Sequence, residues 1–351
     1  MSRDALSVER AVAPAPAVAV NDTVTPAHHF AIVIGIDRYP GLTDLSGACN
    51  DATSFHDWLV DPHGGGLPSR NTRLHLGRDA ADARSATPKK WEIDADPDEL
   101  IDAVRASGPL PTRTRLYLFF AGHGIVASTG TGAWLMADAK LNLFNNLALT
   151  PYRAWLERCR DFDEVVMLSD CCRSIKAEVQ DTPQPHTCDE PESREQRVFL
   201  AHAANIGGRA FEDSTADDLV VQGHFTRALL EGLRGQAADA TGAVLGGSLA
   251  DHLRQRLTEL SADTQLADVD AEDRMVMAVN ARSRRAVRIQ LAQGAARSVR
   301  LLGATSVVAA EVRGGGSWEL QLIDGDYQLL DDRSDRIVRF TVAGADVEVE
   351  G

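Results

Sequence analysis

The stretch Val165-Val166-Met167-Leu168-Ser169-Asp170-Cys171-Cys172-Arg173-Ser174 decides the fold predicted for this chain. Its first four residues are apolar and two of them are β-branched, which is typical of a short buried strand. A carboxylate, two thiols and a guanidinium follow within four residues of the serine. Because open α/β folds place their chemistry at the carboxyl ends of parallel strands, this end is predicted to carry functional side chains.

A second apolar run ends in a similar way further upstream. Residues 116–121 predict a buried strand, and Gly122-His123-Gly124 follows it. A histidine after one strand and a cysteine after another is the arrangement of a thiol nucleophile and its general base. Successive strand residues point to opposite sides, so only one of the two adjacent thiols can face His123. Taken singly, His123 could be a core histidine and Cys172 a small buried apolar residue.

The two motifs resemble those of the caspase-like clan of cysteine peptidases, nearest to metacaspases and bacterial relatives. Phe120–Gly124 is similar to their Ser-Gly-His-Gly run, and Asp170–Ser174 to their Asp-Cys-Cys-His-Ser-Gly run. The resemblance extends over roughly residues 29 to 260 and implies that Cys172 is the nucleophile and His123 its base. Arg173 stands where metacaspases have His, and true caspases also carry Arg at this place. Ile175 stands where metacaspases have Gly.

The same resemblance implies a substrate pocket. Leu45–Ala52 is similar to a metacaspase segment that ends in Gly-Cys-x-Asn-Asp-Ala, although the match slips by one residue at Cys49, which therefore receives no role. By resemblance, Asp51 and Asp170 line the pocket for the residue before the scissile bond. Two carboxylates favour a cation, and the guanidinium of Arg offers bidentate geometry. We expect cleavage after Arg, or after Lys, and not after Asp; Asp51 as a merely solvated helix residue is the alternative.

The chemistry expected of this site is that of a thiolate. His123 would deprotonate Cys172 and later protonate the leaving amine. By resemblance to caspases, the backbone N–H groups of Gly124 and Cys172 would bind the oxyanion of the tetrahedral intermediate. His202 comes after the cysteine and is a rival base, and His224 is expected at the surface at the start of a helix.

The surrounding sequence predicts an α/β domain. The near-continuous apolar run at 30–36 is typical of a strand buried on both faces of a parallel sheet. Further strands are predicted at 72–76, 134–136 and 198–204, and helices at 45–60, 97–105, from Thr150, around 225–233 and at 248–260. The expected fold is a caspase-like, mostly parallel sheet flanked by helices.

The two ends of the chain differ in character from this domain. Residues 1–28 are rich in Ala, Val and Pro and predict a flexible N-terminal arm. Seven short strands separated mostly by Gly or Asp turns are predicted after residue 284, which indicates a small, sandwich-like all-β domain. The predicted domains are therefore the arm at 1–28, a caspase-like peptidase domain at 29–284 and a β domain at 285–351.

The segment after the nucleophile suggests regulation by cleavage. Residues 175–197 lose periodicity, contain three prolines and six acids, and are predicted to form a long exposed loop. In caspase-like enzymes this loop is commonly cleaved during activation. The candidate processing residues, which would fit an acidic pocket, are Lys176, Arg194 and Arg197. Cleavage would come from the enzyme itself or from an upstream activating protease.

Composition restricts the partners and the compartment. The 351-residue chain has 51 acids against 36 bases, a net charge of −15, which argues against nucleic acid and anionic membranes as partners. Five irregularly spaced cysteines do not form a disulfide pattern and fit a reducing cytoplasm. Neither a secretory signal nor a membrane-spanning run is recognisable. We expect a cytoplasmic protein.

No cofactor is required by any motif. Gly64-Gly65-Gly66 is not followed by Gly-Lys-Ser/Thr, which argues against a nucleotide site, and Cys-x-x-Cys spacing is absent, which argues against zinc. Metacaspases often need calcium, and the absence of Asp-x-Asp-x-Asp-Gly spacing leaves calcium open.

The sequence thus predicts a cysteine endopeptidase that acts on proteins or peptides after basic residues. By resemblance, a role in bacterial defence or programmed death is open. A catalytically inactive scaffold with a caspase-like fold and another Cys-His acyl hydrolase remain the alternatives.

Overall fold

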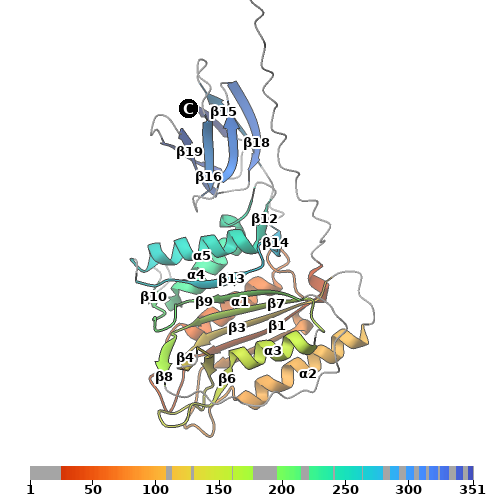
Figure 1. The fold of residues 1–351 in the computed structure, drawn as a ribbon, viewed down its shortest axis with the longest axis vertical. Coiled ribbons are helices and arrows are strands. Elements are labelled where there is room, and N and C mark those ends of the chain that lie inside the picture. Colours follow the sequence, from red (N-terminus) through yellow and green to blue (C-terminus); the bar gives the residue numbers. More distant parts are fainter. Residues whose placement is uncertain are drawn as a thin grey trace, which may run out of the picture.

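A six-stranded sheet forms the centre of the computed structural model and has the order β13-β9-β7-β3-β1-β2 (Figure 1). Five strands are parallel, and β13 at one edge runs antiparallel to β9. In chain order, the strands are β1 (His29–Ile36), β2 (Thr72–Gly77), β3 (Arg115–Gly122), β7 (Glu164–Cys171), β9 (Arg197–His202) and β13 (Asp268–Ala271). The structure describes residues 25–107, 113–127, 130–159, 161–176, 196–214, 221–239, 242–262, 264–279, 285–291, 298–303, 308–313, 316–322, 325–331, 337–342 and 347–350.

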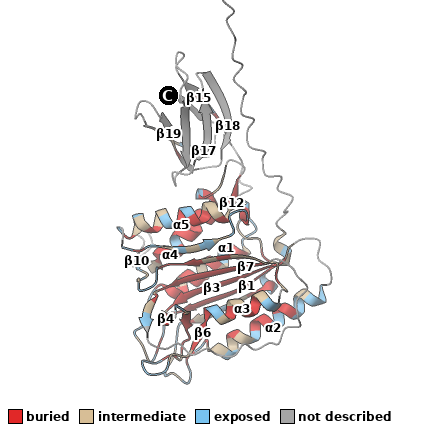
Figure 2. Cartoon of the chain, in the orientation of Figure 1, coloured by how far each residue is buried: buried red, intermediate tan, exposed pale blue. Residues whose placement is uncertain are grey.

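The three central strands are buried along their whole length (Figure 2). This agrees with their near-continuous apolar sequences, because a strand covered on both faces has no solvent side on which to alternate polar residues. The burial of Arg115 and Glu164, at the amino ends of β3 and β7, requires their ion pair, in which Arg115 Nε lies 2.8 Å from Glu164 Oε2.

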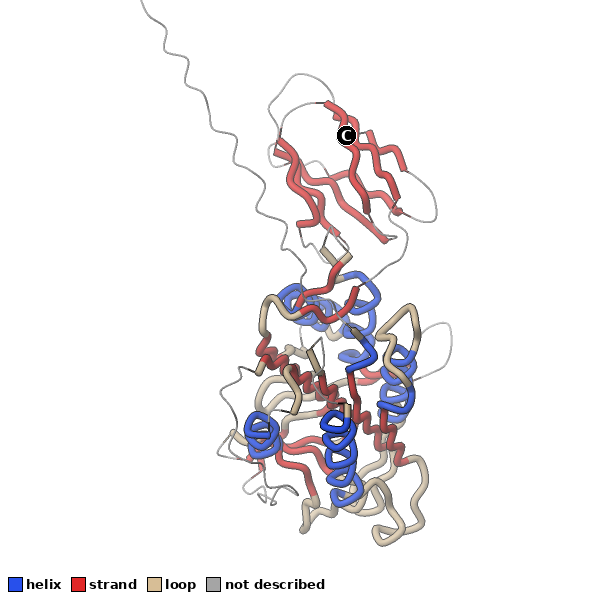
Figure 3. Tube along the Cα trace, turned by 90° about the vertical axis from the view of Figure 1, so that its right-hand side faces the viewer, coloured by secondary structure: helices blue, strands red, loops and turns tan. Residues whose placement is uncertain are grey.

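Helices cover both faces of the sheet, as the view in Figure 3 shows. One core, built with α1 (Ala48–Val60), α4 (His224–Glu231) and α5 (Gly246–Leu260), includes Val166 and Leu168 of β7. The other, built with α2 (Lys90–Ala106) and α3 (Leu149–Cys159), includes Val165, Met167 and Cys171. Odd and even residues of β7 therefore enter different cores, which assigns Asp170 and Cys171 to opposite faces.

Several short elements were not predicted from the sequence. Beside the carboxyl ends of β3 and β7 lies a four-stranded sheet of order β6-β5-β4-β8. It contains β4 (Gly124–Ala127), β5 (Gly132–Leu135), β6 (Asn146–Ala148) and β8 (Ser174–Lys176), of which only β5 overlaps a predicted strand, the one at 134–136. Two antiparallel pairs, β10 (Glu212–Ser214) with β11 (Val221–Gly223) and β12 (Ala243–Leu245) with β14 (Val276–Val279), complete this part of the chain. Strands of three or four residues are too short for periodicity to identify.

The helix predicted at 97–105 begins seven residues earlier than expected, at Lys90. The carboxylate of Glu92 accepts the backbone N–H of Lys89 at 2.7 Å and thereby satisfies an N–H of the first turn. Pro97 consequently lies inside α2, where it lacks the N–H for an intrahelical bond, and does not open the helix as its position suggested. The other helices begin within three residues of their expected starts.

Among the described residues after position 284, the structure has seven strands, the number that the sequence predicted. They are β15 (Arg285–Leu291), β16 (Ser298–Gly303), β17 (Val308–Arg313), β18 (Gly316–Leu322), β19 (Gly325–Asp331), β20 (Ile337–Val342) and β21 (Val347–Glu350). They form a sheet of order β18-β15-β21 and a sheet of order β17-β16-β19-β20. Residues 1–24 of the predicted arm lie outside the described residues.

Candidate active site

The candidate dyad follows two neighbouring, aligned strands. Gly122, the last residue of β3, is paired with Cys171, the last residue of β7. His123 and Cys172 are the next residues of these strands and leave the same edge of the sheet. The register of two parallel strands, and not proximity in sequence, brings the imidazole and the thiol to one place.

The imidazole of His123 is held in place from two sides. Its Nε2 lies 2.7 Å from the backbone oxygen of Thr43. A carbonyl can only accept, so Nε2 carries the proton and Nδ1 is the basic nitrogen. The His123 backbone N–H donates to Tyr39 Oη at 3.0 Å, and the hydroxyl donates to Leu135 O at 3.3 Å. The tyrosine ring also lies against the imidazole, with ring centroids 4.7 Å apart.

The two adjacent thiols have different environments. Cys171 is buried in the core between the sheet and α2 and α3, and burial raises its pKa far above the ordinary value. Cys172 is partly exposed, and its Sγ accepts the Ala210 backbone N–H at 3.3 Å. Of the pair, Cys172 is therefore the thiol that a substrate can reach. No hydrogen bond joins the His123 ring to Cys172 Sγ, although both residues belong to the described part of the chain.

Gly124 lies against the turn that carries the candidate nucleophile, Cys172. A Cβ on Gly124 would come within 2.5 Å of Cys172 O, so no larger residue fits there without movement. Leu135 N–H donates to His123 O, which makes Gly124 and Trp134 a non-hydrogen-bonded pair of the β4–β5 ladder. The Gly124 N–H therefore points away from β5, toward the side on which β8 follows Cys172.

The structure brings Asp51 and Asp170 together, although 118 residues separate them in sequence. Asp51, in the first turn of α1, accepts the Gly223 N–H at 2.9 Å. Asp170 accepts the backbone N–H and the hydroxyl of Thr226 at 3.0 and 2.7 Å. A Cβ on Gly223 would meet carboxylate oxygens of both acids, so this glycine keeps the space between them open.

Both carboxyl groups have raised pKa values. Burial is the main cause for Asp51, and the nearby charge of Asp170 adds to it. Burial likewise raises the pKa of Asp170 to about 6, against the lowering effect of the Thr226 hydrogen bonds. Two buried acids without a counter-ion hold protons more tightly than usual, and a bound cation would reverse this. A guanidinium or ammonium group is the chemical complement of this pair.

Arg173 anchors the turn after the candidate nucleophile. Its guanidinium pairs with the carboxylate of Asp268 in β13, and its side chain is only 10% exposed. Its backbone N–H donates to Gly208 O at 3.1 Å, and its carbonyl accepts the Gly207 N–H at 2.8 Å. Arg173 thus ties the Cys172 turn both to the edge strand and to the 205–210 loop.

The candidate processing residues have different surroundings. Lys176 ends β8, and Arg194 lies outside the described residues. Arg197 is the first residue of β9 and not part of a loop: its backbone N–H donates to Asp163 O at 3.0 Å, and its guanidinium lies 3.4 Å from Glu164. The predicted loop at 175–197 therefore ends earlier than expected, because Gln196 Nε2 already donates to Phe162 O at 2.8 Å.

Two other histidines differ from expectation. His224, expected at the surface, is buried at the start of α4, with its Nε2 3.2 Å from Asp213 Oδ2. His202, considered as a rival base, is buried at the end of β9, and burial lowers its pKa to about 4. Cys49 is buried, and its thiol donates to Gly35 O at 3.3 Å.

Sequence reasoning missed the residues that support the dyad. Thr43 and Ala210 contribute only backbone atoms, which no side-chain pattern can reveal. Tyr39 could have been found, because it follows β1 at the same carboxyl edge as the dyad. Within the described ranges, no group of three or more His, Cys, Asp or Glu side chains is placed to hold a metal ion.

Comparison with known proteins places this domain in a family. A probable protease of a Desulfuromonadales bacterium is 31% identical over 226 residues, which are 59% of this chain and 26% of that protein. The chain thus spans about a quarter of the length of this curated relative. Caspase-1 of Spodoptera frugiperda aligns at 11% identity and a TM-score of 0.46, over 73% of this chain and 92% of that one. The Drosophila initiator caspase Dronc aligns at 11% identity and a TM-score of 0.42, over 77% and 92%. The family model described as the caspase domain matches residues 28–272, and the chain therefore belongs to the caspase domain family of peptidases.

Proposed function

We propose that this chain is a cysteine endopeptidase that cleaves proteins or peptides after Arg, and more slowly after Lys. In this mechanism Nδ1 of His123 takes the proton of Cys172, and the thiolate attacks the scissile carbonyl carbon. The oxyanion of the tetrahedral intermediate accepts hydrogen bonds from the backbone N–H groups of Gly124 and Cys172. His123 then gives the proton to the leaving amine. Water then hydrolyses the thioester and regenerates the thiol.

The Cys172 thiol must give up its hydrogen bond with Ala210 before the reaction can begin. Cys172 Sγ accepts the Ala210 N–H, and the same N–H can stabilise the thiolate until the side chain turns toward the imidazole. Hydrogen bonds of catalytic groups are often incomplete without substrate, so the absence of a His123–Cys172 bond is compatible with catalysis.

The observation that carries the proposed specificity is the buried acid pair. Asp51 and Asp170 meet beside Gly223, and Asp170 stands two residues before the nucleophile in the same strand end. Two partly dry carboxylates attract a cation and disfavour an acidic side chain by like-charge repulsion. This arrangement supports Arg or Lys, and not Asp, before the scissile bond.

A panel of fluorogenic peptides that differ only in this residue tests the proposal. We expect kcat/KM to follow the order Arg, Lys, Asp, with the Asp peptide at least about a thousandfold worse than the Arg peptide. Cys172→Ala should abolish cleavage, while the matched variant Cys171→Ala should keep it, because Cys171 lies in the core. A preference for Asp would overturn the pocket assignment. Absence of peptide cleavage by both the wild type and Cys172→Ala would favour a scaffold without its own activity, and release of non-peptide acyl groups alone would favour another acyl hydrolase.

We further propose that the enzyme is made as a zymogen and is activated by cleavage between residues 175 and 197, by itself or by an upstream protease. Arg194 is the preferred site, because Lys176 pairs with Ala127 in the β4–β8 ladder and the backbone of Arg197 is hydrogen-bonded at the start of β9. Mass spectrometry of purified wild-type and Cys172→Ala chains, with and without calcium, is expected to find cleavage only in the wild type if processing is autocatalytic. An intact, fully active single chain would contradict this part of the proposal.

The setting of the enzyme is also a proposal. A cytoplasmic location fits the cysteine content, and a role in bacterial defence or programmed death follows the resemblance to bacterial caspase-like proteins. None of the helices in the described ranges is sufficiently long and apolar to span a membrane.

A further inference from the structure

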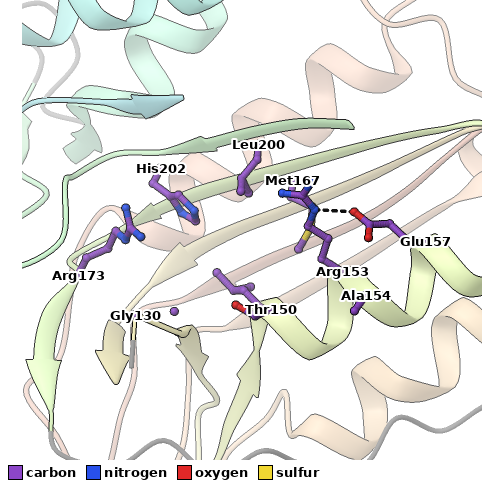
Figure 4. Close-up of a pocket in the computed structure, with 11 residues that line it drawn as sticks. Gly130, Thr150, Arg153, Ala154, Glu157, Met167, Arg173, Leu200 and His202 are labelled. Atoms are coloured by element: carbon purple, nitrogen blue, oxygen red, sulfur yellow. Dashed lines mark hydrogen bonds and ion pairs between the residues drawn. The ribbon is translucent and has the colours of Figure 1, made fainter. Parts of the chain in front are cut away.

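A cavity lies between α3 and the strands β7 and β9, close to the turn that carries Cys172 (Figure 4). Its volume is about 300 Å³, enough for a small organic molecule. Met167, Leu200 and His202 line it, and Met167 belongs to the core on the α2–α3 side of the sheet. Asp170, whose partner Thr226 belongs to α4, faces the opposite side. This cavity is therefore separate from the acid pair.

Arg173 and His202 line one end of the cavity, and the two residues are only 8% and 6% exposed. Each carries a buried nitrogen that has no hydrogen-bond partner in the described part of the chain, Arg173 Nε and His202 Nδ1. Buried polar groups are nearly always hydrogen-bonded in folded proteins, so two unpaired nitrogens at one end of one cavity indicate that a ligand supplies the acceptors.

The charge at this end favours an anion with a single negative charge. Thr150, in the first turn of α3, lines the same end, where a helix presents its positive pole (Figure 4). Glu157 lies at the other end and is paired with Arg153 at 2.7 Å (Figure 4). The charge of Arg173 is already partly offset by Asp268, and burial keeps His202 neutral at pH 7. A doubly charged phosphate would find too little positive charge here.

The rest of the lining selects the body of the ligand. Met167 and Leu200 provide an apolar wall beyond the two nitrogens, while Gly130 leaves space at the mouth. The two oxygens of a carboxylate match two N–H donors from a guanidinium and an imidazole. We propose that this cavity binds a monocarboxylate with a short apolar tail, with its carboxylate at Arg173 and His202 and its tail along Met167 and Leu200. The proposal does not depend on peptide cleavage.

Calorimetric titration of the full chain at pH 7.5 with octanoate and, separately, with octan-1-ol tests this site. We expect one saturable octanoate site and at least about tenfold weaker binding of the alcohol, which has the same tail without the charge. Thr150→Glu should weaken octanoate binding at least about tenfold, because it adds a negative charge at the carboxylate end. This exposed substitution in the first turn of α3 is favourable to the helix, so the variant should fold. Thr150→Gln has nearly the same size without the charge and should bind within about threefold of the wild type.

Three results would overturn the proposal. Equal binding of octanoate and octan-1-ol would show that the cavity selects only the apolar tail. Unchanged octanoate affinity in Thr150→Glu, with the variant folded by circular dichroism, would place the binding elsewhere. Absence of saturable binding by octanoate up to about 10 mM, weaker than a typical small-ligand site, would show that the cavity takes no such ligand.

Discussion

The buried carboxylate of Asp51 is unfavourable for the stability of the fold, whereas the proposed function requires it. Its carboxylate is buried beside that of Asp170, with the Gly223 N–H as its hydrogen-bond donor. Burial of two like charges without a cation is unfavourable, and the raised pKa values of both groups express this cost. A protein that needed only its fold would gain by replacing one of the acids with a neutral residue.

Asp51→Asn tests this opposition. Asp170 keeps a proton that the unfolded chain releases between about pH 4 and 6, and burial shifts the pKa of Asp51 in the same direction, so the free energy of unfolding of the wild type falls as pH rises through this range. Because Asn can still accept the Gly223 N–H, the variant should be more stable by about 1–3 kcal/mol at pH 7.5, with a smaller gain at pH 5. Its kcat/KM for Arg peptides should fall at least about tenfold, since half of the pocket charge is lost.

Urea unfolding at both pH values and peptide kinetics provide the measurements. Asp57→Asn, an exposed position on the same helix, is the matched control and should change neither quantity. In the wild type, kcat/KM for Arg peptides should decrease as pH falls below about 6, because Asp170 becomes protonated there. Lower stability of Asp51→Asn at pH 7.5 would contradict this account of the pair.

At the scale of elements, the sequence identified the long buried strands and missed most of the short strands around the candidate site. The runs at β1, β3 and β7 are apolar over most of their length, so they could be predicted as buried strands. The parallel pairing of β3 with β7 then places His123 and Cys172 at the same edge of the sheet. The extent of α2 could not be predicted, because a proline usually opens a helix, whereas here Glu92 caps it. Residues that act through backbone atoms, such as Thr43 and Ala210, left no pattern in the sequence.

The edge strand β13 is expected to position the turn of the nucleophile. Asp268→Ala would leave the buried guanidinium of Arg173 without its carboxylate, and we expect a loss of about 1–2 kcal/mol in unfolding free energy, less than for a fully buried pair because Asp268 is half exposed. We also expect kcat to fall about tenfold with a smaller change in KM, since the thiol would be held less firmly. Asp270→Ala, an exposed position in the same strand, is the control. Equal effects of the two substitutions would argue against a positioning role of β13.

At the scale of the whole chain, the caspase-like unit extends beyond the residues matched by the family model. That match ends at residue 272, whereas β14 begins at Val276 and pairs with β12. Val276 O also accepts a hydrogen bond from the buried guanidinium of Arg115 at 2.6 Å, and Met275 is fully buried. The segment after the match is thus part of the core, which a family-based boundary does not reveal.

Two truncated chains test this boundary. A chain that ends at residue 284 retains β14 and should unfold cooperatively and cleave Arg peptides like the full chain. A chain that ends at residue 272 loses the Arg115 acceptor and two buried methionines, and we expect it to be less stable by at least about 3 kcal/mol. Thermal unfolding and expression yield measure the difference. Similar stability of the two chains would show that β14 is dispensable.

The strand β13 has a further consequence for self-association. Exposed strand edges act as templates on which other chains add strands, and charged side chains or covering groups suppress this. Here the β9 edge is already occupied by β13, whose exposed Asp268 and Asp270 are negative, and Arg254 covers the carbonyl of Val269 at 2.8 Å. Copies of this chain are therefore not expected to join by extending the sheet at this edge, and any aggregation on partial unfolding should begin elsewhere.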